Sequence, residues 1–341
     1  MAIQWKRRLA AGLVLAVLPL IMTAGSLHFH CEEARAAQVI KEEKGTYGCL
    51  TWPQNLNAVR SEVEIFKEIP KDLRADTPIA NAIYRNTQVY TNSLMLDMRQ
   101  LPAEKPLFYR VRAYDLDGHP IGPYSQPADV ESALFKTERN APIPHDSYGK
   151  GNGSVLLYPV YAYTGNPNAA RYEVEVTSKY PENLHGFSPS VHRIYAAKTE
   201  LTDLYDDAPR TGTYYWRVRG MDSTGKTVGE WSLPQEIKNP VKHWKVAVYG
   251  DSISHGGGHL SFGPADLAYS YESYLDFPSI NLSQSGDTSE AMVMRFEKDV
   301  LPFSPEYLLI LGGTNSLRAG VPAADVISDL KEIQRKCREH G

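Results

Sequence analysis

Lys245–Ser252 reads KVAVYGDS, an apolar run that ends in a polar turn. The run does not alternate with polar residues, which is typical of a strand covered on both faces in a parallel sheet. Tyr307–Leu311 (YLLIL) has the same character, and apolar residues recur at helical spacing over 292–300 and 326–337. The order of strand, helix, strand and helix predicts a wound α/β layer over residues 244–341.

A serine follows the first of these strands. In open α/β sheets, ligands collect outside the carboxyl ends of the strands, and Gly250–Ser252 begins where the strand ends. Ser252 is therefore placed where a nucleophile belongs. Gly, Asp and Ser are also ordinary turn formers, so this segment alone is weak evidence.

A second segment, Asn281–Asp287 (NLSQSGD), lies between the strands. Asp287, with Glu290 three residues later, predicts a helix N-cap and its reciprocal partner. Gly286 would then precede a helix whose free N–H groups and positive dipole end attract negative charge. Its N–H is a candidate donor to an oxyanion; the alternative is a glycine needed only for the turn.

The third segment, Gly312–Asn315 (GGTN), follows the second strand. The side chain of Asn315 can donate hydrogen bonds through its NH₂ group. An asparagine after two glycines is more often a turn former. Three such segments in this order, each at a predicted strand end, are harder to obtain by accident.

The three segments resemble the blocks of the SGNH hydrolases, also called GDSL esterases and lipases, over residues 244–341. The resemblance implies that Ser252 is the nucleophile. It also implies that the N–H of Ser252, the N–H of Gly286 and the side chain of Asn315 form an oxyanion hole. A flavodoxin-like three-layer α/β fold, ester hydrolysis through an acyl-enzyme and no metal or organic cofactor are expected on the same basis.

Two departures from that family change the expectations. Ser316 stands where the family commonly has aspartate, which predicts weaker support of the loop. The family's catalytic Asp and His share an Asp-x-x-His segment, and the sequence ends before an equivalent. His255, His259 and His340 are poor substitutes, because the first two lie too close to Ser252 along the chain and the third ends a helix. A serine without a base is a weak nucleophile, so near inactivity is expected.

An internal repeat occupies the middle of the chain. Tyr109–Asp115 (YRVRAYD) returns as Trp216–Asp222 (WRVRGMD), and Glu62–Ile65 is echoed by Glu173–Val176. Apolar and arginine residues alternate in both copies, which predicts half-buried antiparallel strands. Asp-Gly and Thr-Gly turns follow the two strands and predict hairpins.

These modules of about 100 residues predict two-sheet sandwiches. Their strand and exit motifs resemble fibronectin type III modules over residues 45–135 and 142–240. The aromatic side chains are interpreted as core residues, and a carbohydrate platform built from them is an alternative without support; they are Tyr109, Tyr124, Trp216 and Trp231. The expected fold class is two all-β sandwiches followed by a partial α/β domain.

Residues 1–36 have the basic start, apolar middle and small-residue exit of a secretory signal peptide. An uncleaved membrane anchor is the alternative, since the apolar stretch approaches the roughly 20 residues that span a bilayer. No membrane span is expected after cleavage. In either case the body of the protein is expected outside the cytoplasm, secreted or at the cell surface.

Charge and cysteine content argue against several classes of protein. The chain has a net charge of −4, and its first 36 residues hold four basic and two acidic residues, so the remainder carries −6. Without a clustered basic surface, nucleic acid is not an expected partner. Three cysteines at these spacings predict neither a disulfide framework nor a zinc site. The expected partner is an ester substrate of extracellular or envelope polysaccharide; the rival function is a non-catalytic surface binding or adhesion protein.

Overall fold

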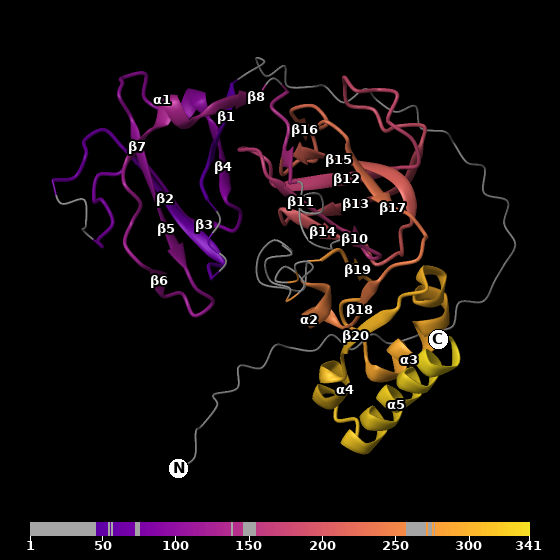
Figure 1. The fold of residues 1–341 in the computed structure, drawn as a ribbon. Helices are drawn as coiled ribbons and strands as arrows, with labels where there is room; N and C mark the ends of the chain where they lie inside the picture. The colour runs from indigo at the N-terminus through magenta and orange to yellow at the C-terminus, as the bar shows by residue number, and fades with distance from the viewer. Residues whose placement is uncertain are drawn as a thin grey trace, which may run out of the picture. The chain divides into compact units, whose positions relative to one another are not determined.

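The computed structural model describes residues 46–53, 55, 57–71, 76–137, 139–145, 155–256, 271, 275 and 277–341. The predicted signal peptide and His259 lie outside these residues. Within the described ranges, no helix is both long enough and apolar enough to cross a membrane. The protein is multidomain and rich in sheet, with few helices (Figure 1).

The first module has two antiparallel sheets. One has the order β4-β1-β8, built from β1 (Tyr47–Thr51), β4 (Ser93–Asp97) and β8 (Phe135–Thr137). The other has the order β3-β2-β5-β6, with β7 paired to β5, and consists of β2 (Arg60–Phe66), β3 (Tyr84–Val89), β5 (Phe108–Tyr114), β6 (Pro120–Ile121) and β7 (Ala128–Asp129). Two short helices complete it, η1 (Met98–Gln100) and α1 (Val130–Ala133). Leu50, Val63 and Val111 share a buried apolar cluster, so the two sheets enclose one core.

The second module repeats this arrangement. Its smaller sheet has the order β14-β11-β9, from β9 (Ile143–Pro144), β11 (Val160–Thr164) and β14 (Asp203–Tyr205). Its larger sheet has the order β13-β12-β15-β16, with β17 paired to β15, from β12 (Arg171–Thr177), β13 (Arg193–Thr199), β15 (Gly212–Met221), β16 (Thr227–Val228) and β17 (Gln235–Asn239). Tyr163, Val174 and Trp216 lie in the core between them. The fibronectin type III character of both modules stays a prediction.

The larger sheet of the second module is also covered on its outer face. Arg217 on β15 is fully buried and its Nε donates to the Glu175 carboxylate on β12 at 2.5 Å. The ring of Trp231 lies 4.6 Å from the Arg217 guanidinium and 4.4 Å from that of Arg219. A cation–π layer therefore closes the face that the alternating pattern left open to solvent.

The first module has the same arrangement on its outer face, a buried arginine–glutamate pair covered by an aromatic ring. Arg110 donates to the Glu64 carboxylate at 2.8 Å, and the ring of Tyr124 lies 3.8 Å from Arg110 and 5.3 Å from Arg112. Both arginines are buried. The prediction of half-buried strands is therefore wrong for the outer faces, because a second, ionic and aromatic layer covers them.

The four aromatic residues divide between the two layers. Tyr109 and Trp216 lie in the clusters between the sheets, as predicted. Tyr124 and Trp231 are equally buried, but on the outer faces against arginines. The sequence pattern did not separate these two environments.

The C-terminal layer is a four-stranded parallel sheet of order β10-β19-β18-β20. Its strands are β10 (Val155–Leu156), β18 (Val246–Gly250), β19 (Ile280–Asn281) and β20 (Tyr307–Leu311). Its helices are α2 (Ser252–His255), α3 (Ser289–Asp299), η4 (Leu301–Phe303), α4 (Thr314–Arg318) and α5 (Ala323–Glu339). Helices α3 and α5 lie side by side (Figure 1), and Phe296 and Ile333 from them join the core that holds Ala247 and Tyr249. The predicted strands and helices are present.

Strand β10 comes from the range predicted for the second module. It pairs with β19, placing Leu156 opposite Asn281, and the Leu157 N–H donates to the Asn281 carbonyl at 2.8 Å. Leu156, Leu157 and Tyr158 are buried in the same cluster as Tyr249. The sheet is therefore not confined to residues 244–341.

Strand β20 ends the order of the sheet at the opposite edge. Apart from Leu308, its side chains are largely exposed, with Leu309 at 37% and Leu311 at 44%. Among the side chains of β20, Leu308 is the one that packs against the buried apolar cluster of the C-terminal layer. An apolar edge strand of this kind is a template for pairing with another chain.

Replacing Glu175 with Ala should lower the free energy of unfolding by about 3–5 kcal/mol, because Arg217 would keep a buried charge without its partner. Denaturation followed by tryptophan fluorescence measures this. Glu236→Ala is the matched control, since Glu236 pairs with Lys238 at the surface of the same sheet and its loss should barely move the midpoint. Equal shifts in the two variants would contradict the buried ion pair.

Leu309→Lys should reduce self-association, because a charge on an exposed edge opposes strand pairing. Light scattering after size exclusion measures the mass, and the thermal midpoint should stay close to that of the parent. Leu308→Lys is the control and should lower the midpoint strongly, because Leu308 packs on the core. Unchanged association in Leu309→Lys would show that β20 is not the surface responsible.

Candidate active site

Ser252 begins α2 directly beyond the end of β18. The preceding residue, Asp251, is the N-cap, and its buried carboxylate accepts the Ile253 N–H at 3.0 Å. An aspartate at this position is a favourable cap, so the sequence itself ends the strand and starts the helix here. Ser252 is only partly buried. The predicted nucleophile thus lies on a capped turn at the carboxyl end of the central strand.

Gly250 sets how closely this turn approaches β20. A Cβ on Gly250 would lie 2.0 Å from the carbonyl oxygen of Leu311, its register partner in β20. The Ser254 hydroxyl donates to the same carbonyl at 3.3 Å. The absence of a side chain at 250 therefore brings the Ser252 turn against the start of the segment that carries Asn315.

The loop after β19 follows the end of β18 through two hydrogen bonds. The Leu282 N–H donates to the Val248 carbonyl at 2.8 Å, and the Gln284 N–H to the Gly250 carbonyl at 3.0 Å. Gly286 then adopts a φ of +92°, in the left-handed region that glycine takes without steric cost. Gly286 is exposed at the same edge of the sheet.

The predicted N-cap of the next helix is wrong by one residue. Thr288 caps α3, with its hydroxyl accepting the Ala291 N–H at 3.2 Å. Asp287 is buried and its carboxylate accepts from the Arg295 guanidinium instead. Both residue types are good caps, and the ion pair with Arg295, about two helical turns along, decides between them.

Asn315 connects the third segment to the second. Its Nδ2 donates to the carbonyl of Asp287, the residue after Gly286, at 2.8 Å. Because an amide NH₂ carries two hydrogens, this bond orients the group and leaves a second donor. The structure thus joins the Asn315 side chain directly to the Gly286 loop, while Ser252 reaches that loop through Gly250 and Gln284.

Arg295 on α3 ties the strand ends together. Its guanidinium donates to the Leu282 carbonyl at 2.6 Å, the Gly250 carbonyl at 3.2 Å and the Asp299 carboxylate at 3.2 Å, besides the Asp287 carboxylate. Its side chain is 10% exposed. Sequence reasoning missed this residue; an arginine on the buried side of an amphipathic helix is the signal that marks it.

The pKa values of this pair follow from burial. Burial raises the pKa of Asp287 above its usual range, although the Arg295 charge opposes the shift. Burial alone would lower the pKa of Arg295, but Tyr249 and Asp287 outweigh it and raise the value. A raised carboxyl pKa favours the fold fully below the ordinary carboxyl range, and this contribution is lost as pH rises through the folded value. The Arg295 charge makes this pKa shift of Asp287 smaller than burial alone would make it.

Ser316 supports the third segment in a way that its sequence position did not predict. Its buried hydroxyl accepts the Ser289 N–H at 2.9 Å, at the first residue of α3. The Ser289 hydroxyl in turn donates to the Asp329 carboxylate on α5 at 2.6 Å. Ser316 therefore supports the loop through a serine pair that joins α4 to α3 and α5, and weaker support than an aspartate would give stays a prediction.

The described histidines do not offer a base to Ser252. His255 is buried, with Nε2 at 2.7 Å from the Tyr158 carbonyl and its ring edge-on to Tyr205. His340 is exposed at the end of α5. Within the described part of the chain, no hydrogen bond joins a histidine to the Ser252 hydroxyl.

One exposed turn of the first module has metal-ligating groups. Ligand atoms of Asp115, Asp117 and His119 lie within 4.8 Å of one another. The Asp115 carboxylate also accepts the His119 N–H at 2.7 Å, so the turn itself accounts for its position. The group is remote in sequence from the strand ends described above.

Comparison with known proteins adds a family match. Residues 248–341 match the GDSL-like Lipase/Acylhydrolase family. This match supports a hydrolase of the esterase or lipase type in the C-terminal part. No curated protein matches the chain significantly.

Three solved structures show weaker likenesses. A candidate acylhydrolase from Bacteroides fragilis is 22% identical over 30% of this chain and 46% of its own, with a TM-score of 0.22. Protein YxiM of Bacillus subtilis is 15% identical over 53% and 54%, with a TM-score of 0.25. The FN1–FN3 domains of chicken CNTN1 are 14% identical over 57% and 56%, with a TM-score of 0.18. The chain spans about half of the length of each.

Arg295→Met should destabilise the C-terminal layer by about 3–5 kcal/mol, because Asp287 and Asp299 would stay buried without their cation. Thermal or urea unfolding of the 341-residue protein measures it. Arg335→Met is the control, since Arg335 on α5 forms only exposed pairs with Glu332 and Glu339. A fully stable Arg295→Met protein would show that the guanidinium is not what holds the strand ends.

Proposed function

We propose that the C-terminal layer is a serine ester hydrolase domain in which Ser252 attacks the carbonyl of an ester. The N–H groups of Ser252 and Gly286 and the Nδ2 of Asn315 would donate to the oxyanion of the tetrahedral intermediate. Collapse of this intermediate expels the alcohol and leaves an acyl-Ser252. Water then releases the acid through a second tetrahedral intermediate.

The hydrogen bond from Asn315 to the Asp287 carbonyl is the observation that carries this proposal. It brings an amide donor next to Gly286 at the edge where the Ser252 turn lies, and the family match covers all of these positions. The bond also fixes the Asn315 amide before substrate arrives. Donors held in place in this way cost no reorganisation during reaction.

The substrate class belongs to the same proposal. The signal-like residues 1–36 and the two accessory modules support an esterase that is secreted or at the cell surface. They favour carbohydrate esters, such as O-acetyl groups of extracellular or envelope polysaccharide, over cytosolic lipids. Without a base bonded to Ser252 among the described residues, slow acylation is expected rather than rapid turnover.

The test is acetylation of the 341-residue protein by p-nitrophenyl acetate, followed by intact mass and peptide mapping. One acetyl group should appear on Ser252 and be absent from Ser252→Ala. Asn315→Ala should slow acylation by about 10²–10³, the usual effect of removing one oxyanion donor. Asn183→Ala is the amide control, because Asn183 lies in the second module, and it should acylate at the parent rate.

Two outcomes would contradict the proposal. Acetylation of Ser252→Ala at the parent rate would show that another residue reacts. Acetylation of Ser252 at parent rate in Asn315→Ala would remove Asn315 from the oxyanion site. The first outcome favours the rival function, a surface binding protein without catalysis.

A further inference from the structure

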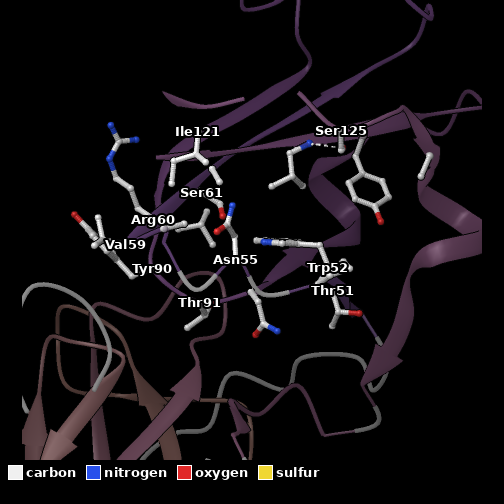
Figure 2. A pocket seen from close by; sticks show the side chains of 18 of the residues that line it. Thr51, Trp52, Asn55, Val59, Arg60, Ser61, Tyr90, Thr91, Ile121 and Ser125 are labelled. Atoms are coloured by element: carbon white, nitrogen blue, oxygen red, sulfur yellow. Dashed lines mark hydrogen bonds between the residues drawn. The ribbon is translucent and has the colours of Figure 1, made fainter. Parts of the chain in front are cut away.

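A cavity of about 430 Å³ is lined mainly by the first module, and His145 and Ala162 of the second module also contribute to its lining. Pockets for small ligands commonly have volumes of about 300–1,000 Å³. Its apolar walls come from the core, including Val89 and Val111, and its opening is lined by the segments around Trp52 and Tyr90. Figure 2 shows the Trp52 indole extended across the cavity, with the Asn55 side chain nearby.

Two buried residues of the cavity wall carry hydroxyl groups. Ser61 on β2 is 7% exposed and Tyr109 on β5 is 8% exposed. Hydroxyl groups on a cavity wall can donate hydrogen bonds to a polar ligand and accept them from it.

The second module fills the corresponding space. Ser61 pairs with Ala113 in β5, and Tyr172 pairs with Gly220 at the equivalent place in β15. The Tyr172 ring packs edge-on against Tyr163, with centroids 5.0 Å apart, and the residue is 7% exposed. The same fold therefore accepts a large ring where the first module has a serine. The cavity is present because Ser61 and Ala113 are both small. A module of this fold does not require it, since Tyr172 fills the same space in the second module.

The chemistry of the walls fits a neutral polyhydroxylated ligand. Among the described residues that line the cavity, none is aspartate or glutamate. The guanidinium of Arg60 is already engaged, because it donates to the Thr87 carbonyl at 2.8 Å and lies 4.1 Å from the centre of the Tyr114 ring. An aromatic face, planar amides, hydroxyls and the His145 ring remain, and the His145 Nε2 lies 2.7 Å from the Thr164 hydroxyl. Sugars present an apolar C–H face for stacking and a rim of hydroxyls for such donors and acceptors.

We propose that this cavity binds the chain end of a neutral polysaccharide. One sugar ring would stack on Trp52, with its hydroxyls bonded by Asn55, Ser61 and Tyr109. This site lies mainly in the first module, and its existence does not depend on hydrolysis at Ser252. It would hold the protein on a glycan independently of the C-terminal chemistry.

Calorimetric titration of the 341-residue protein with xylohexaose, cellohexaose and chitohexaose tests the proposal. At least one of these sugars should bind. Trp52→Ala should raise its Kd about tenfold or more through the loss of stacking. Ser61→Tyr should abolish binding by filling the cavity, with the thermal midpoint retained because the second module tolerates tyrosine there. Asn55→Ala, at an exposed position whose side chain accepts the Asn57 N–H at 3.0 Å, should weaken binding with little effect on the thermal midpoint.

Ser252→Ala is the control and should bind the sugar as the parent does. Its unchanged affinity separates this site from the proposed esterase, so either idea can fail alone. The inference is overturned if none of the three sugars binds. It is equally overturned if Trp52→Ala, Asn55→Ala and folded Ser61→Tyr all bind with the parent's Kd.

Discussion

The buried guanidinium of Arg295 is the interaction on which the C-terminal layer depends. It donates to main-chain carbonyls at the ends of two neighbouring strands and to the carboxylates of Asp287 and Asp299. Removing a charge from water is costly, and here hydrogen bonds and opposite charges compensate for it. The positions of Ser252 and Gly286 follow, because both lie within two or three residues of groups that Arg295 holds.

Much of this layer follows from local sequence patterns. Lys245–Tyr249 and Tyr307–Leu311 indicated the main strands, and the spacing of Met292 and Phe296 indicated the face of α3 that packs on the sheet. These features depend on neighbours in the chain, so periodicity detects them. The convergence of three segments at one edge also follows from parallel strand order. The residue that caps α3 could not be predicted in this way, because Asp287 instead pairs with Arg295, about two helical turns further along.

Features that depend on contacts between residues far apart in the chain were not predicted from the sequence. Alternation in the modules revealed the inward faces of their strands, but gave no sign that Arg110 and Arg217 are buried beneath aromatic rings. Comparison of the two repeat copies does indicate the aromatic residues that cover these arginines. Tyr124 and Trp231 occupy equivalent exits in the two copies, and each stacks on the arginines of its own module. Comparison of the copies with each other is therefore more informative than the periodicity of either.

Strand β10 has a consequence for how the chain folds. Its partner β19 lies far away in sequence, so their parallel pairing closes a long loop before it gains any stabilisation. Pairings of this kind raise contact order and slow folding. The second module spans most of that loop, and its Arg210 N–H and Asn239 side chain donate to the carbonyls of Leu157 and Leu156. A second module that folded first would therefore shorten the loop that the β10–β19 pairing has to close.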